Sequence, residues 1–208
     1  MDAAALLKPE HAAATQCFVS FDDGTQDHHE IVFPLLQQLG LRGVFFVPTA
    51  KLNQPGYLTS VQLRELADAG QTIGCHSHEH KRMDVLSNEE IQRQLETSRN
   101  ILRDTTGVEP GIFAPPGGFS NSAVRTAALR SGLRIIRTMR WGFNRQPDFA
   151  ALETISLNRH TNDRQFQNIL EGRQRRLLYL GKQAAKALVP ARAYERLRSW
   201  IFELARKH

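Results

Sequence analysis

The sequence has little cysteine and no long hydrophobic run. Two cysteines in 208 residues, Cys17 and Cys75, cannot make a disulfide framework. Both lie in apolar segments, so we expect two buried free thiols. No apolar stretch approaches the roughly 20 residues of a membrane-spanning helix, and the N-terminus lacks the basic start and apolar stretch of a secretion signal. These absences predict a cytoplasmic protein without a transmembrane helix.

Most of the chain lacks an excess of either positive or negative charge. Residues 1–162 contain 16 Lys and Arg against 17 Asp and Glu, whereas residues 163–208 contain 11 against 4. The net charges are therefore −1 and +7, and the formal charge of +6 comes from the C-terminal segment. That segment has no interleaved aromatic platform, which argues against nucleic acid as a partner. We predict a neutral domain over residues 1–162 and a basic helical tail over residues 163–208.

Short apolar runs alternate with helical patterns along the neutral domain. Apolar spacing, capping signals and terminal glycines predict helices near residues 32–39, 59–69, 87–106 and 122–131. The apolar runs predict strands at residues 17–21, 44–47, 72–75, 112–114, 134–137 and 154–157. This order is typical of an α/β protein with a mainly parallel sheet. We expect a distorted or incomplete (β/α) barrel of about six to seven strands, or else an open sheet, with a C-terminal helical extension.

Polar residues gather where the predicted strands end. Asp22 and Asp23 follow the first strand, and His76 and His80 follow the third. In parallel α/β folds such positions meet at one rim. Alone, the two aspartates fit a turn or helix cap, and the histidines fit a solvated surface cluster. Together, two histidines and a carboxylate favour a divalent-metal site with open positions.

A glycosidase with a carboxylate pair is a poorer interpretation of the same residues. Its two carboxyl groups would lie about 5 to 9.5 Å apart on either side of a sugar. Asp22 and Asp23 are adjacent in the sequence, and the side chains of adjacent strand residues point to opposite faces.

The motifs resemble those of the polysaccharide deacetylase family, the NodB-homology or carbohydrate esterase family 4 type. The family's first motif, Thr-Phe-Asp-Asp-Gly, is matched by Ser20–Gly24, and its second, His-Ser/Thr-x-x-His, is matched by His76–His80. The third motif, Arg-x-Pro followed by an aromatic residue and Gly, is matched only in part by Ala114–Gly118. The resemblance runs in order from about Cys17 to His160.

This resemblance implies a metal-dependent hydrolase that removes N-acetyl groups from an amino-sugar saccharide, either an exopolysaccharide or a lipid-linked glycan. It implies that Asp23, His76 and His80 bind one divalent ion. Zn²⁺ is the expected ion, although two nitrogens and one oxygen also suit Co²⁺, Mn²⁺, Fe²⁺ or Ni²⁺. Asp22 is implied as the general base.

Further site residues come from the less specific motifs. Gly117, which follows Pro115 and Pro116, is expected to present a backbone N–H to the developing oxyanion, so Pro116 and Gly117 are placed at the substrate. Trp141 is a candidate for the missing aromatic wall, and its alternative is a core or rim tryptophan. His160 is the candidate that protonates the leaving amine, in a segment that matches the family's last motif imperfectly.

The third motif lacks the arginine that tethers the base carboxylate in the family. Ala114 occupies its position and cannot make that contact. Arg137, Arg140 and Arg159, near other strand ends, are candidates to replace it, and the sequence does not select among them. A surface or structural role is the alternative for each.

The basic tail contains two helical patterns. Asn162 or Asp163 is expected to cap a helix with Phe166, Ile169 and Leu170. After Pro190, apolar residues at heptad spacing predict a helix with a basic face. This helix either docks on the barrel or contacts an anionic membrane surface.

Two other functions remain open at this point. One is metal-dependent hydrolysis of another C–N bond, for example in an N-formyl amino sugar. The other is a degenerate family member that binds a saccharide without catalysis.

Overall fold

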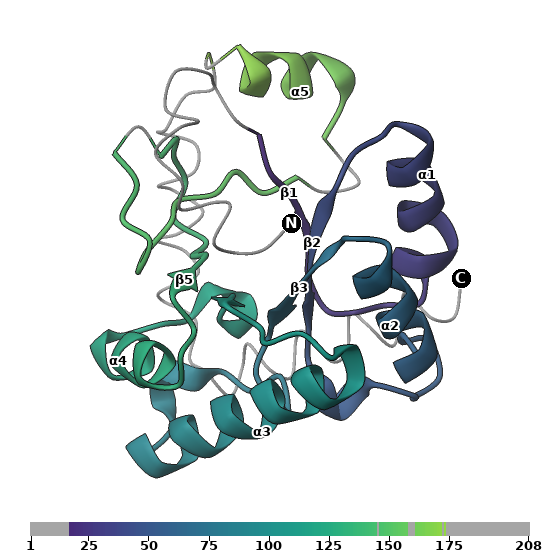
Figure 1. Ribbon diagram of the computed structural model, residues 1–208. Coiled ribbons are helices and arrows are strands. Elements are labelled where there is room, and N and C mark those ends of the chain that lie inside the picture. The colour runs from purple at the N-terminus through teal and green to yellow at the C-terminus, as the bar shows by residue number, and fades with distance from the viewer. Residues whose placement is uncertain (1–16, 145, 158–160, 172, 174–208) are drawn as a thin grey trace. The chain divides into compact units, whose positions relative to one another are not determined.

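The computed structural model describes residues 17–144, 146–157, 161–171 and 173 (Figure 1). The chain divides into two compact units, Met1–Arg140 with Asn144–Thr154 and Trp141–Phe143 with Ile155–His208. The first unit contains the whole sheet and four α-helices, and the second contains helix α5.

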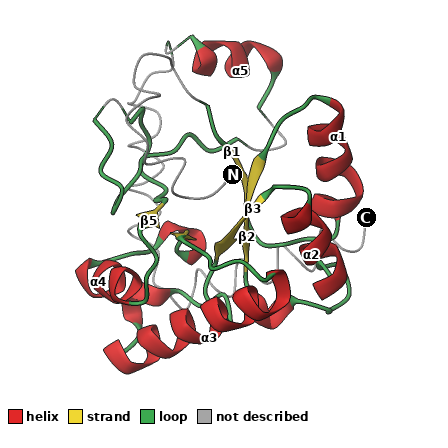
Figure 2. Cartoon of the chain, in the orientation of Figure 1, coloured by secondary structure: helices red, strands yellow, loops and turns green. Residues whose placement is uncertain are grey.

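Five parallel strands form a single sheet whose order follows the sequence, β1-β2-β3-β4-β5 (Figure 2). The strands are β1 Val19–Phe21, β2 Gly43–Val47, β3 Thr72–Cys75, β4 Ile112–Phe113 and β5 Ile135–Ile136. Because parallel crossovers are right-handed, adding each new strand at the same edge places the connecting helices on one face of the sheet. The expected α/β class with an incomplete, distorted barrel is confirmed.

The four helices of the first unit connect these strands. They are α1 Phe33–Gln38, α2 Ser60–Asp68, α3 Asn88–Thr106 and α4 Ser122–Arg130. The expected capping box of Thr59 and Gln62 is present at α2. At α3, the Ser87 hydroxyl accepts the N–H of Glu90, whereas the Glu90 carboxylate pairs with Arg93 instead of closing the box. Local sequence signals therefore set where the helices start.

The two faces of the sheet have different partners. Phe45, Val47, Cys75 and Phe113 belong to a large core that includes residues from all four helices, which lie along one side of the sheet (Figure 1). The opposite face carries a smaller cluster, packed against Phe149 and Leu152: Val44, Phe46, Ile112, Ala114 and Ile135. Burial on both faces explains why the strands are continuous apolar runs in the sequence.

The prediction of a sixth strand at residues 154–157 is wrong. These residues are described and form no strand. The preceding segment lies beside β5 instead, where a single parallel bridge pairs Arg137 with Leu152. The N–H of Ile136 donates to Phe149, and that of Leu152 donates back to Ile136. Between Phe149 and Leu152 the chain makes a turn, in which the N–H of Ala151 donates to the carbonyl of Asp148.

The first helix is present, but only part of the apolar spacing over residues 32–39 faces the core. Leu35 and Leu39 are exposed, whereas Phe33 and Leu36 face the core. A π-helical turn at His28–Val32 precedes α1. Because a π turn inserts an extra residue, it rotates the face that the following helix presents to the sheet.

The two cysteines also differ from each other. Cys75 is buried, as expected, but Cys17 is exposed. The expectation was wrong for Cys17 because β1 begins only at Val19 and is the edge strand of the sheet.

Only the beginning of the basic tail is described. Helix α5, Asp163–Leu170, starts at the expected cap, where the Asn162 side chain accepts the N–H of Gln165. Residues 174–208, with the predicted helix after Pro190, lie outside the described residues. Within the described ranges, no helix combines the length and the apolar character needed to cross a bilayer.

Candidate metal centre

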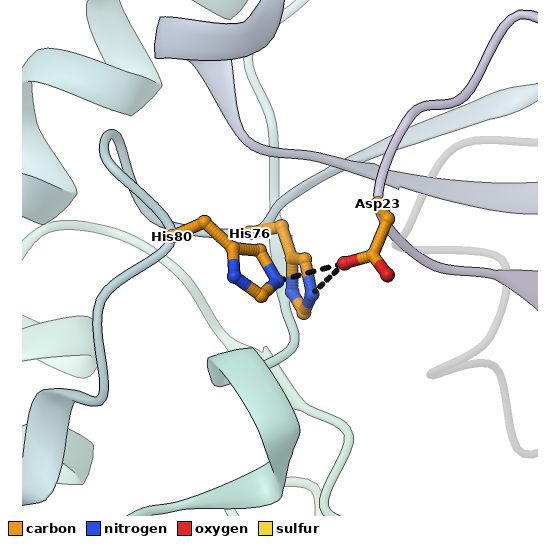
Figure 3. Close-up of side chains that lie close together, drawn as sticks. All are labelled: Asp23, His76 and His80. Carbon is orange, nitrogen blue, oxygen red and sulfur yellow. Dashed lines mark ion pairs between the residues drawn. The ribbon is translucent and has the colours of Figure 1, made fainter. Parts of the chain in front are cut away.

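Three predicted ligands meet at the C-terminal ends of β1 and β3. Asp23 follows β1, and His76 and His80 lie in the loop after β3. One donor atom from each residue lies within 4.8 Å of the others. Nε2 of His80 is 2.7 Å from Oδ1 of Asp23, and Nε2 of His76 is 3.5 Å from the same oxygen (Figure 3).

The backbone at this site is bent in an unusual way. Among the described residues other than glycine, four have a positive φ: Asp23 at 78°, Asn53 at 63°, Ser77 at 62° and His80 at 61°. Three of the four belong to the two metal loops. Such conformations cost on the order of 1–3 kcal/mol each and persist where the surroundings hold them. Two of the three predicted ligands, Asp23 and His80, therefore depend on strained backbone for their direction.

A backbone carbonyl fixes the orientation of His76. Nδ1 of His76 lies 2.6 Å from the carbonyl oxygen of Ala114. Because a carbonyl only accepts, Nδ1 carries the proton, and Nε2 is the nitrogen that faces Asp23 and could bind an ion. Ala114 lies at the position where the family has its arginine, and here it supports the metal centre through its main chain.

The electrostatics of Asp23 suit a cation. Burial alone would raise the pKa of its carboxyl group, but hydrogen bonds and charge from His76 and His80 hold the pKa well below the usual range. The carboxylate is therefore ionised and faces two imidazoles that are almost fully buried. Two nitrogens and one carboxylate oxygen are a donor set that Zn²⁺ and related divalent ions accept. The residues present thus fit a metal ion.

The neighbouring Asp22 is paired with an arginine from the other edge of the sheet. Nη2 of Arg137 donates to Oδ1 of Asp22. In a flat sheet, β1 and β5 would lie about 19 Å apart, since neighbouring strands are about 4.8 Å apart. An ion pair cannot span that distance, so the sheet curls until its two edge loops meet. This contact joins the two ends of the half-barrel at its rim.

Arg137 itself is held on several sides. Its guanidinium carbon lies 4.8 Å from the centroid of the Phe46 ring, and Nη1 lies 3.1 Å from the sulfur of Met139. The other two candidate arginines are Arg140 and Arg159. Nη2 of Arg140 donates to the carbonyl of Ala151, and Arg159 lies outside the described residues. The structure therefore selects Arg137 as the residue that contacts Asp22.

The remaining predicted site residues are only partly located. Pro116 and Gly117 lie in the turn Pro116–Gly118 after β4, where Pro116 is buried and Gly117 has a φ of 61°. Trp141 belongs to the second unit, where its ring packs edge-to-face against Phe143. His160 lies outside the described residues. The roles given to these residues stay predictions.

One residue near the centre was missed in the sequence. Gln94 of α3 is completely buried, and its side chain bonds to the loop that contains the metal ligands. The signal was present, because Gln94 interrupts the apolar stripe formed by Ile91, Leu95 and Leu102. A polar residue on a core-facing stripe requires buried partners.

The chain belongs to the polysaccharide deacetylase family, whose model matches residues 11–136. Chitin deacetylase 1 of Saccharomyces cerevisiae is 31% identical over 154 residues, which are 71% of this chain and 49% of that protein. The peptidoglycan-N-acetylglucosamine deacetylase of Bacillus cereus is 28% identical over 130 residues, 62% of this chain and 57% of that protein. This chain spans only 24% of chitin deacetylase 1 of Cryptococcus neoformans. It therefore spans about a quarter to about half of several relatives.

Solved structures agree on the fold. The Streptococcus pyogenes deacetylase PplD superposes with a TM-score of 0.71 at 18% identity, over 81% of this chain and 79% of that one. A Bacillus anthracis protein described as a CE4 family pseudoenzyme superposes with a TM-score of 0.55 at 21% identity, over 61% and 44% of the two chains. Because the fold is shared with a pseudoenzyme, activity has to be argued from the residues of the site.

Proposed function

We propose that this protein is a metal-dependent hydrolase that removes N-acetyl groups from an amino-sugar saccharide. The observation that carries the proposal is the convergence of Asp23, His76 and His80, whose donor atoms lie within 4.8 Å of one another. Asp22, the neighbouring carboxylate, is paired with Arg137 at the same rim. Family membership supports the reaction class, and the geometry of these residues supports the roles proposed for them.

The proposed roles rest on the motifs of the family and, for Asp22, Asp23, His76, His80 and Arg137, also on the positions of the side chains. A divalent ion bound by Asp23, His76 and His80 would supply a Lewis acid that activates water and polarises the amide carbonyl. Asp22 accepts the proton of the attacking water as general base, and Arg137 keeps its carboxylate in one orientation. The backbone N–H of Gly117 is the proposed oxyanion donor. His160 is the proposed acid for the leaving amine.

The substrate class rests on the relatives. Their names include chitin deacetylases and a peptidoglycan-N-acetylglucosamine deacetylase, so an N-acetylglucosamine-containing glycan is the substrate to test first. Whether the glycan is a polymer or is linked to a lipid is tested by offering both forms.

The first experiment measures bound metal per chain by elemental analysis after reconstitution with Zn²⁺ or Co²⁺. We expect about one ion per chain, because three ligands form one site. The variants Asp23→Asn and His76→Ala should lose it. Asparagine is chosen because it tolerates the left-handed backbone of residue 23. A wild-type protein that binds no ion would rule out the proposed function.

The second experiment separates metal binding from catalysis. Asp22→Asn keeps the shape of the side chain but removes the base, so the variant should retain the ion and release no acetate from N-acetylated oligosaccharides. An Asp22→Asn variant with wild-type turnover would show that Asp22 is not the base. His160→Ala applies the same assay to the proposed acid, and an unchanged rate would remove that role.

Two rival functions predict different results. A degenerate saccharide-binding member would bind glycan without releasing acetate. The missing third-motif arginine and the imperfect last motif argue for that interpretation, and the Arg137–Asp22 pair weakens the first of these arguments. Hydrolysis of an N-formyl amino sugar would release formate in place of acetate, so one assay that measures both acids distinguishes the alternatives.

A further inference from the structure

Gln94 lies where the packing of α3 calls for an apolar residue. It sits on the buried face of the helix with Ile91, Leu95, Ser98 and Leu102, and it has no exposed surface. Burying an amide without partners costs on the order of 1–3 kcal/mol. The side chain must therefore make contacts that an apolar residue could not make.

Three of its four hydrogen bonds reach the loop after β3, and the fourth stays within α3. Oε1 of Gln94 accepts the backbone N–H of His78 at 3.1 Å and that of Glu79 at 2.8 Å. Nε2 donates to Oε2 of Glu79 and, at 3.2 Å, to Oε1 of Glu90. Both lone pairs and both hydrogens of the amide are used. No smaller polar side chain supplies the same four bonds from this position.

The loop needs such support because its backbone is strained. Ser77 and His80, on either side of the two contacted N–H groups, have φ values of 62° and 61°. One internal bond, from the N–H of His80 to Oγ of Ser77 at 3.1 Å, closes the turn. From outside the loop, the N–H groups of Thr49 and Ala50 donate to the carbonyls of Ser77 and His78. The Gln94 amide adds contacts to the next two N–H groups, from a helix that is itself part of the core.

We propose that Gln94 is a positioning residue for the metal centre. By fixing the main chain at residues 78 and 79, it holds His76 and His80 at the separation and direction needed to bind the same ion. The inference rests on the proposed function, in which these histidines are metal ligands. Groups that orient metal ligands typically contribute about 10- to 100-fold to metal affinity.

The main test is Gln94→Leu, which keeps side-chain bulk and removes all four hydrogen bonds. Titration of the metal-free protein with Zn²⁺ against a competing chelator should give a dissociation constant raised about 10- to 100-fold. The matched control is Thr106→Val in the same helix. The Thr106 hydroxyl is also buried and bonded, but to the carbonyls of Leu102 and Val108. Thr106→Val should lower stability and leave Zn²⁺ affinity unchanged.

A rescue variant separates positioning from general packing. Gln94→Glu alone keeps acceptors for the two N–H groups but places a carboxylate against both Glu79 and Glu90. Adding Glu79→Gln exchanges the two side chains, restores a donor and acceptor between the positions, and keeps the net charge. The double variant should recover Zn²⁺ affinity relative to Gln94→Leu and to Gln94→Glu.

Hydrogen exchange of the metal-free protein provides a readout that needs no ion. In Gln94→Leu, the amides of His78 and Glu79 should lose protection, whereas the amides of β2 keep theirs. Unchanged Zn²⁺ affinity in a folded Gln94→Leu variant would overturn the inference. If the wild-type protein binds no Zn²⁺, that result contradicts the proposed function and the inference together. The two failures are therefore distinguishable.

Discussion

Arg137 shows how a missing side chain can be replaced from elsewhere in a fold. Ala114 leaves no arginine after β4, yet the guanidinium of Arg137 reaches Asp22 from the end of β5. Its planar, permanently charged fork suits a carboxylate better than an ammonium group does. The Asp22 carboxylate is thus held by a residue 115 positions away in the sequence.

We predict that Arg137→Ala lowers kcat about 100-fold and leaves metal content unchanged. Small misplacements of a reacting group can have that effect on rate, and Arg137 is not a ligand of the ion. Arg137→Lys should recover part of the rate because it restores the charge without the fork. Acetate release and elemental analysis on the same samples measure both quantities.

Arg140→Ala is the matched control for this prediction. Arg140 bonds to the carbonyl of Ala151, so its loss should change kcat by a small factor only. If Arg140→Ala were as inactive as Arg137→Ala, the pairing with Asp22 would not explain the loss.

The two cysteines give a prediction about accessibility. Burial raises the pKa of the Cys75 thiol to about 11, whereas Cys17 is exposed. We expect one thiol per native chain to react with a thiol reagent at pH 8, and two after denaturation. In Cys17→Ser, the native protein should not react. A fast native reaction in that variant would show that Cys75 is accessible.

The same raised pKa has a consequence at high pH. As the pH rises from about 9 to about 11, the unfolded chain loses the Cys75 proton and the folded chain keeps it. The stability contributed by this group is present below that range and is lost through it.

At the scale of elements, the turn after β4 packs closely against the end of β5 at a glycine. Gly118 has a φ of 73°, and a Cβ added there would overlap the side chain of Met139 and approach its backbone nitrogen to 3.4 Å. Met139 in turn contacts the guanidinium of Arg137. A side chain at residue 118 would therefore displace Met139 and, with it, the segment that positions Arg137.

We predict that Gly118→Ala reduces activity more than its effect on stability explains. The control is Gly40→Ala, because Gly40 has a similar φ of 63° with nothing within 4 Å of an added Cβ. Each variant carries the left-handed backbone cost of about 1–2 kcal/mol, but only Gly118→Ala should also lower kcat. Thermal unfolding and acetate release on both variants test this. Equal kcat values in the two variants would contradict it.

Local patterns predicted most of the elements, and the three residues predicted as metal ligands lie close together. The strands near residues 44–47 and 72–75, the Thr59 cap and the loop histidines depend on residues close in sequence. The Arg137–Asp22 pair depends on the curl of the sheet, which no local pattern encodes. The prediction of a sixth strand was wrong for a related reason. The backbone groups of Phe149 and Leu152, which precede residue 154, already bond to the edge of β5.

At the scale of the whole molecule, the charge of the tail gives a prediction for the full chain. Residues 163–208 have a net charge of +7, and each basic residue near an anionic leaflet contributes about 1 kcal/mol. The membrane hypothesis predicts co-sedimentation with vesicles that contain an anionic lipid, weakened by salt and absent with neutral vesicles. Equal binding to both vesicle types, or to neither, would contradict the hypothesis.

The metal couples the site to the stability of the first unit. An ion that binds the folded chain and not the unfolded chain stabilises it by about 2.7 kcal/mol when its free concentration is 100 times the dissociation constant. For a chain of this size, each kcal/mol shifts Tm by about 2–4 °C. Saturating Zn²⁺ should therefore raise Tm by roughly 5–11 °C over the chelated protein.

Because the chain has two compact units, the shift should be confined to one transition. The ligands Asp23, His76 and His80 all lie in the unit that contains the sheet, so calorimetry should show Zn²⁺ moving the transition of that unit. Asp23→Asn should remove the response and retain the transition itself, since the sheet and its core do not depend on the ion. A Tm that rises equally in Asp23→Asn would locate the stabilising ion somewhere other than this triad.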